Sequence, residues 1–303
     1  MPSLLFMDLS QTLHNKAHML RFQHRGDKHT VVVERVQLSG HIRLCDEPPS
    51  KDGMELVRRL VARIDQNRSN LTDAGRFARG KEMWRWRKNT NLNPANKSIE
   101  VRIERAIVRL LGDDWVNQVP TASGLTAASE GRRSLDLVHR HSAVEFDFIE
   151  LKALRPEQRS SGHQSPLFAA MEILIYGLIF LYCKENRGDL FADSTTQRPI
   201  LDAEIVHLEV LATSNCYRRT ERAEPFRIGW LNQLIVQGLT ELNRHSEASV
   251  SFNFTFRQFP EGFSWTEADH HQLLTCDPSS ECLTALRHKI QAAIENRECV
   301  MLV

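Results

Sequence analysis

The sequence predicts an α/β fold with a mixed central sheet, in which a helix, three strands, a second helix and a further strand follow one another. Three observations predict it. Apolar residues recur at helical spacing after Ser98, β-type stretches lie between residues 115 and 151, and a long apolar helix then precedes another strand. The chain has 303 residues, of which 41% are apolar and 25% charged, enough for one large core with a smaller appendage.

The region before this core is predicted to be an added N-terminal part. Its first fifty residues mix short β-type stretches, notably 30–36, with polar turns. Residues 54–64 place apolar side chains at helical spacing, which predicts an amphipathic helix, and a basic, turn-prone segment follows at 67–96. We therefore divide the chain into an N-terminal region, 1–97, which could bind DNA or a partner, and a core with a C-terminal extension, 98–303.

The core is predicted to begin with a helix that Ser98 caps and that ends near Gly112. Three strands follow, separated by a Gly- and Ser-rich segment and by a short turn. A long apolar helix, a strand, an amphipathic helix and an alternating strand complete the order. The predicted strands are 115–119, 134–139, 144–151, 203–212 and 250–256, and the later helices are 165–184 and 228–243.

Charge is unevenly distributed although the net charge is only +1. Between Arg58 and Arg109 there are fourteen Lys or Arg residues against five Asp or Glu, which leaves this stretch at +9. Such a stretch suits a polyanion, because neutralising phosphates releases counterions; solvated faces of amphipathic helices explain it equally well. Within it, a run of aromatic and basic residues could stack on nucleotides and neutralise them, or its tryptophans could anchor the segment to the core. The run is Trp84, Arg85, Trp86, Arg87 and Lys88.

The composition favours a soluble cytoplasmic protein. No leader-like pattern opens the chain, and the six cysteines include no C-x-x-C pair, which argues against a disulfide framework or a zinc knuckle. The apolar stretch 166–183 contains Glu172 and is short for a membrane span, so we expect a buried core helix and no membrane partner.

The strand at 144–151 leads into residues that carry chemistry. Alternation places Val144, Phe146 and Phe148 on one face with Glu150 and Lys152. An acid and a base at the end of an apolar strand are costly to bury unless they pair or bind a cation. Asp136 likewise interrupts the preceding apolar strand.

These residue types suit phosphodiester hydrolysis assisted by a hard cation, which prefers carboxylate and carbonyl oxygens. We expect Mg²⁺ or Mn²⁺ to be held by Asp136, Glu150 and the carbonyl of Leu151. Lys152 would orient or help deprotonate the attacking water and offset the phosphate charge. Glu104, on the preceding helix, would bind a second ion or its waters. The alternative is that Glu150 and Lys152 form a purely structural ion pair.

The same residues resemble the motifs of the PD-(D/E)XK nuclease superfamily, and the local match is to archaeal Holliday junction resolvases. Glu104-Arg105 resembles their helix motif, 120–124 loosely resembles their Pro-x-Ser-Gly turn, and Asp136 and 149–152 (Ile-Glu-Leu-Lys) resemble the rest. The resemblance covers residues 98–152, and Leu135 stands where the family usually has Pro before the Asp.

The resemblance implies a restriction-endonuclease-like core and a metal-dependent nuclease acting on DNA, with RNA not excluded. It also implies that Ser123 touches substrate, and a homodimer or larger complex is expected because cutting two strands usually takes two sites. Prokaryotic defence or DNA processing would be its setting. The alternative function is an inactive nuclease fold that binds nucleic acid or serves as an assembly subunit. His139 and His141, close to the site in sequence, are either accessory catalytic residues or solvated turn histidines.

Overall fold

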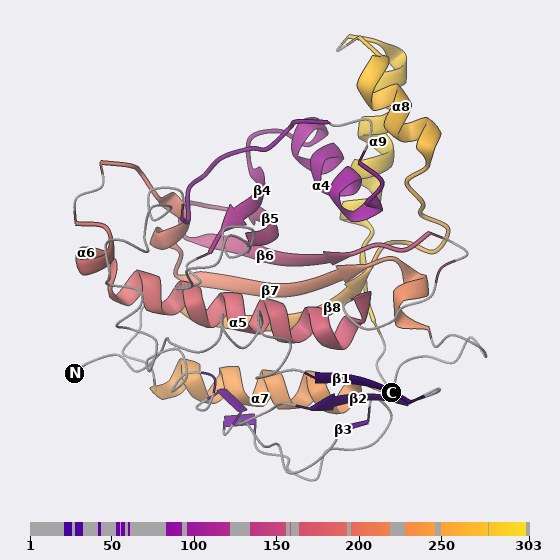
Figure 1. Cartoon of the computed structure of the whole chain (residues 1–303). Coiled ribbons are helices and arrows are strands. Elements are labelled where there is room, and N and C mark those ends of the chain that lie inside the picture. The colour runs from indigo at the N-terminus through magenta and orange to yellow at the C-terminus, as the bar shows by residue number, and fades with distance from the viewer. Residues whose placement is uncertain are drawn as a thin grey trace.

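The computed structural model describes two sheets and the helices that pack on the larger one (Figure 1). The described residues are 21–25, 28–32, 42–43, 53–54, 56–57, 60, 83–92, 96–121, 134–155, 158, 164–192, 195–218, 228–245, 250–277 and 279–300. The smaller sheet is antiparallel and has the order β1 (Arg21–Arg25), β2 (Lys28–Val32), β3 (Ile42–Arg43).

The larger sheet has six strands in the order β4 to β9 and is mixed, which confirms the predicted α/β class. β6 pairs in parallel with β7, and β7 with β8, while the other neighbours are antiparallel. The strands are β4 (Trp115–Pro120), β5 (Ser134–Arg140), β6 (Glu145–Lys152), β7 (Ile205–Ala212), β8 (Ser251–Gln258) and β9 (Glu298–Cys299).

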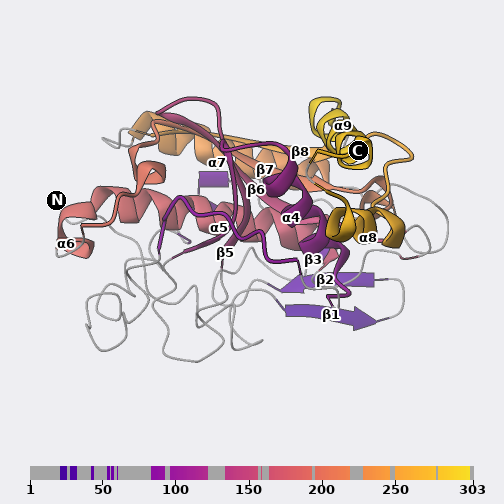
Figure 2. The same cartoon turned by 90° about the horizontal axis from the view of Figure 1, so that it is seen from above.

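Helices cover both faces of this sheet (Figure 1; Figure 2). On one face lie α5 (Pro166–Glu185) and α7 (Gly229–His245); on the other lie α4 (Ile99–Leu110), α8 (Glu267–Thr275) and α9 (Glu281–Glu295). Short helices occur at α6 (Arg187–Leu190), η4 (Pro199–Asp202) and η5 (Ser214–Tyr217). Each helix and strand predicted between residues 98 and 258 is present, with its ends within two residues of the prediction.

The long apolar helix α5 is a core helix, as its sequence predicts. Its length and composition would allow it to cross a membrane, but 94% of its most apolar window is buried inside the protein. Ser165 caps it by accepting a hydrogen bond from the backbone N–H of Phe168. Burial on all sides explains why the helix is apolar around its whole circumference.

Parts of the region before residue 98 belong to the same hydrophobic core as the sheet. Leu56, Val57 and Leu60 are buried in it, as the predicted amphipathic helix requires, and so are Met83 and Trp84. The hydrophobic core is therefore continuous across the predicted boundary at residue 98, and the division of the chain there stays a prediction. Residues 33–36 and 61–64 of the predicted elements lie outside the described residues.

The C-terminal part contains elements that the sequence analysis did not predict. They are α8, α9 and the edge strand β9. A disulfide between Cys276 and Cys282 joins the end of α8 to the start of α9, so the expectation that cysteine pairing plays no part is wrong for these two residues. Because disulfides persist mainly in oxidising compartments, this bridge gives no support to the cytoplasmic location inferred from cysteine spacing.

Candidate functional site

Asp136 lies where the large sheet is locally interrupted. Gln118 of β4 and Asp136 of β5 lie opposite each other but do not pair. The two strands pair on both sides of this position. Gln118 has a φ of 51°, in the left-handed region that residues other than glycine rarely adopt. On its other side, the ladder of β5 with β6 ends at Leu137, and the Oδ2 of Asp136 accepts a hydrogen bond of 2.9 Å from the N–H of Leu151.

Glu150 and Lys152 occupy the end of β6 and are both buried. The Nζ of Lys152 donates to Oε1 of Glu150 at 2.6 Å and to Oε2 of Glu172, on α5, at 3.4 Å. The other carboxylate oxygen of Glu150, Oε2, is buried and has no hydrogen-bond partner in the part of the chain that the structure describes. The carboxyl groups of Asp136 and Glu150 are neighbours, since the charge of Glu150 raises the pKa of Asp136, and a shared ion requires such proximity.

α4 brings two further carboxylates to the same gap. Its N-terminus is fixed by Ser98, whose side chain accepts from the N–H of Val101. Glu104 is almost fully buried and accepts a 2.6 Å hydrogen bond from Nε2 of Gln118. Glu100, one turn earlier, accepts a 3.2 Å bond from the N–H of Ala153, just beyond β6. The left-handed backbone of Gln118 thus directs its side chain to Glu104 beside Asp136.

Burial and mutual repulsion change the proton affinities of these groups. Burial, and then the charge of Glu150, raise the pKa of Asp136 well above its ordinary value, and burial with Asp136 does the same for the pKa of Glu104. Burial also raises the pKa of Glu150 to about 8, with Lys152 opposing and Glu172 adding to the rise. Burial alone would lower the pKa of Lys152, but Glu150 and Glu172 outweigh it and the pKa rises.

The cluster therefore has more negative groups than positive ones. It contains five carboxyl groups, on Glu100, Glu104, Asp136, Glu150 and Glu172, beside the ammonium of Lys152. Without a further cation, carboxyl groups in such a cluster stay protonated to higher pH than free ones, as their raised pKa values indicate. A hard divalent cation fits this donor set, because carboxylate oxygens are its preferred ligands and no described residue hydrogen-bonds to Oε2 of Glu150.

The aromatic and basic run is bound to the core at several points. Trp84 is fully buried, with its ring 6.0 Å from that of Phe148 and 5.6 Å from that of Phe180 between centroids. No face of the Trp84 ring is exposed for a base to stack on, so nucleotide stacking is wrong for Trp84 and the anchoring alternative holds. Trp86 packs edge-on against Phe146 and its Nε1 donates to the carbonyl of Asp113.

The remaining members of the run are less buried. Lys88 pairs with Asp113 at 2.6 Å, Arg85 is half-buried and Arg87 is exposed. A role for them and for Trp86 in binding nucleic acid stays a prediction. Ser123 lies outside the described residues.

The site contains residues that the motif analysis missed or gave little weight. Gln118 and Glu100 were not singled out, and no local pattern marks a glutamine that adopts a left-handed conformation. Glu172 entered the sequence analysis only as the charge within the apolar stretch 166–183. Its spacing from Ser165 places it one to two turns into α5, and contact with Lys152 depends on tertiary packing.

A pocket of about 560 Å³ opens beside the cluster, at the carboxyl ends of β6 and β7. Its lining includes Ile99 and Arg102, on either side of Glu100, and Leu154, which is two residues beyond Lys152. The lining carries both charges, since Arg102 and Arg155 pair there with Glu267, and Phe263 adds an aromatic surface. Ligands of α/β proteins commonly bind beyond the carboxyl ends of parallel strands, so the pocket is well placed for part of a substrate.

Comparisons with protein-family models, with curated proteins and with solved structures found no match to this chain.

Proposed function

We propose that the protein is a divalent-metal-dependent nuclease of the PD-(D/E)XK type that hydrolyses phosphodiester bonds in DNA. The observation that carries the proposal is the cluster of five buried or half-buried carboxyl groups around Lys152, in which one oxygen of Glu150 has no hydrogen-bond partner among the described residues. Its members come from α4, β5, β6 and α5, which the proposal matches to the first helix, the second and third strands and the second helix of a restriction-endonuclease-like core.

Within this proposal Asp136 and Glu150, with the carbonyl of Leu151, would hold Mg²⁺ or Mn²⁺, and Glu104 would hold a second ion or its waters. When bound, such an ion supplies charge neutralisation at the phosphate and a more acidic water. Asp136 is already oriented for this task, since its Oδ2 is fixed by the N–H of Leu151.

Lys152 is the group that this chain itself would offer to the substrate. Its ammonium is held between Glu150 and Glu172, and its raised pKa keeps it charged at neutral pH. A charged ammonium held in place can orient a water and offset the negative charge that develops on the phosphate. Two carboxylate partners on the same Nζ restrict the positions that the ammonium can take.

A cleavage assay tests the proposal. The full-length protein is incubated with plasmid and oligonucleotide DNA in Mn²⁺, in Mg²⁺ and in EDTA, with RNA oligonucleotides as a parallel substrate. We expect cleavage only with the metal and a loss of at least about 100-fold in Lys152→Ala. Lys289→Ala is the matched control, because Lys289 also pairs with a carboxylate, Asp269, on the opposite face of the sheet. Cleavage that persists in EDTA or in Lys152→Ala refutes the proposal.

A second candidate is an inactive nuclease fold that binds nucleic acid or serves as an assembly subunit. The observation that favours it is the burial of the ion pair of Glu150 and Lys152, which are only 4% and 7% exposed. Calorimetric titration separates the two: DNA binding without Mn²⁺ binding supports the inactive protein, and Mn²⁺ binding that Asp136→Asn removes supports the nuclease. A homodimer and a cytoplasmic role in defence against foreign DNA belong to the nuclease proposal as its setting.

A further inference from the structure

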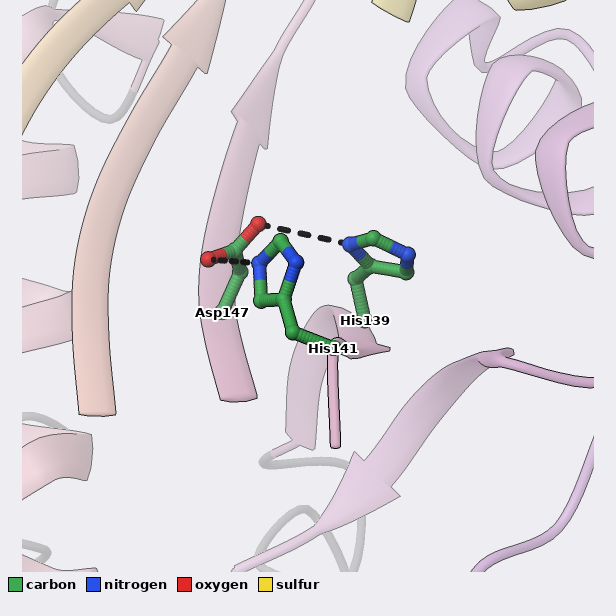
Figure 3. A group of neighbouring side chains, drawn as sticks. All are labelled: His139, His141 and Asp147. Atoms are coloured by element: carbon green, nitrogen blue, oxygen red, sulfur yellow. Dashed lines mark hydrogen bonds and ion pairs between the residues drawn. The ribbon is translucent and has the colours of Figure 1, made fainter. Parts of the chain in front are cut away.

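A second group of metal-ligand side chains lies away from the carboxylate cluster. His139 at the end of β5, His141 in the following turn and Asp147 in β6 turn their polar atoms toward one another (Figure 3). Nε2 of His141 lies 2.8 Å from Oδ1 of Asp147, and Nδ1 of His139 lies 3.5 Å from Oδ2. All three ligand atoms fall within 4.8 Å of one another.

This group is separate from the proposed nuclease site. Successive side chains of a strand point to opposite faces, so Asp147 faces the side of α4 and α9 whereas Glu150 and Lys152 face the side of α5. Asp147 and Lys152 are also five positions apart in β6, which corresponds to roughly 16 Å along the strand.

The three side chains are held in place before any ion binds. The ring of His139 stacks on Trp115, with 4.1 Å between ring centroids and 13° between planes, and it lies edge-on to His141 at 4.4 Å. Asp147 is buried and its Oδ2 accepts a 3.0 Å bond from Nη2 of Arg297. Partners of this kind orient metal ligands in known sites.

One polar atom of the group lacks the partner that its burial calls for. Nδ1 of His139 is buried and makes no hydrogen bond to the described residues, its contact with Oδ2 of Asp147 being a 3.5 Å ion-pair approach. A buried ring nitrogen without a hydrogen-bond partner costs folding free energy, because it gives up its bonds to water and gains none in the protein. A metal ion between His139, His141 and Asp147 would satisfy it.

We propose that His139, His141 and Asp147 bind a first-row transition-metal ion, Zn²⁺ being the reference case. Two imidazole nitrogens and one carboxylate oxygen form a ligand set that suits Zn²⁺ and not Mg²⁺, which prefers oxygen ligands. The side chain of His141 is 37% exposed, so a water could complete the coordination. Bringing the atoms to bonding distance of one ion requires only small shifts, which the exposed ring of His141 can make.

The ion would fasten the hairpin of β5 and β6 at its turn. The opposite end of the same hairpin carries Asp136 and Glu150. We expect a structural role for the ion, and the site does not depend on the proposed nuclease function.

Zn²⁺ binding to the metal-stripped full-length protein tests the inference, measured by competition with a chromophoric chelator. One tightly bound equivalent, counted apart from any ion at the carboxylate cluster, is expected to depend on the histidines, its affinity falling about 100-fold or more in His139→Ala and in His141→Ala. Controls are His271→Ala, an exposed histidine of α8, and Lys152→Ala, a change at the proposed nuclease site; both should keep the Zn²⁺ affinity of the wild type. Visible absorption of the Co²⁺-loaded protein, present in the controls and lost in both histidine variants, gives a second readout.

Zn²⁺ binding that is absent in the wild type, or unchanged in the histidine variants, overturns the inference. If His139→Ala does not fold, His141→Gln decides the matter, because this side chain is partly exposed and its loss removes little packing. Cleavage activity plays no part in the readout, so a failure of the nuclease proposal leaves this result intact, and the reverse also holds.

Discussion

Removing divalent cations should make the stability of this protein fall as pH rises from weakly acidic to weakly alkaline values. The pKa of Glu150 is raised from 4.5 to about 8, first by burial. A carboxyl group with a raised pKa binds its proton more tightly in the folded chain than in the unfolded one. Its contribution to stability is therefore complete below about pH 4.5 and is lost as pH rises toward about 8.

The size of the effect follows from the same two values. At about 1.4 kcal/mol for each pKa unit, the move from 4.5 to about 8 corresponds to an upper bound of about 5 kcal/mol. That is comparable with the whole stability of many domains. Lys152 does not reverse the sign, because its raised pKa lies above this pH range and the ammonium stays protonated throughout. Asp147 does not reverse the sign either, because its pKa is lowered and it titrates below this pH range.

The assay is urea unfolding at several pH values between 5 and 8.5, with EDTA or with Mn²⁺. In EDTA the wild type should lose stability with rising pH, whereas Glu150→Gln, which cannot ionise at this position, should show a smaller slope, the remainder coming from Asp136 and Glu104. Mn²⁺ should restore about 2.7 kcal/mol at 100 times its dissociation constant, most strongly at high pH where fewer protons must be displaced. Glu298→Gln, at an exposed carboxylate, is the control and should follow the wild type. Equal slopes in wild type and Glu150→Gln would refute the reasoning.

Three further predictions concern packing and backbone. Trp84→Ala should cost about 3–5 kcal/mol in urea unfolding because the side chain is fully buried, and a loss below about 1 kcal/mol would contradict its role as an anchor. At position 118, Gln118→Gly should be more stable than Gln118→Ala by about 1 kcal/mol, since only glycine adopts the left-handed φ of 51° without strain; equal melting curves would argue against that backbone conformation. Gly238→Ala should lose about 1–3 kcal/mol because its Cβ would collide with the carbonyl oxygen of Gly53, while Gly188→Ala, whose Cβ meets nothing, should unfold like the wild type.

The core elements were predictable because their signals are local. Ser98 marks the start of α4 by its capping side chain, and the alternation of apolar residues up to Glu150 and Lys152 marks β6 and the face to which they point. Parallel pairing of β6 with β7 also follows from the long apolar helix between them, since a crossover is needed to return the chain.

The parts that were missed depend on contacts between distant residues. The conformation of Gln118 depends on the gap opposite Asp136 and on its hydrogen bond to Glu104. The sequence next to Gln118 indicates neither of these contacts. Cys276 and Cys282 are brought together by the turn between α8 and α9. The apolar pattern of these two helices is short and largely polar, so the sequence did not predict them. For Trp84 the sequence left nucleotide stacking and anchoring both open, and only tertiary packing against Phe148 and Phe180 decides for anchoring.

The distinction between a metal site and a structural ion pair rests on the count of carboxyl groups, which the sequence alone did not supply. The pair of Glu150 and Lys152 is neutral, and by itself it would be a buried salt bridge whose loss of one partner is strongly destabilising. α4 and α5 approach the gap from opposite layers and add Glu100, Glu104 and Glu172, so the local charge without an ion favours protonated carboxyls. Replacing one of these carboxyl groups by an amide should then stabilise the metal-free protein above pH 7 and weaken its response to Mn²⁺. A purely structural ion pair of Glu150 and Lys152 would instead lose stability after the same change, with no dependence on metal.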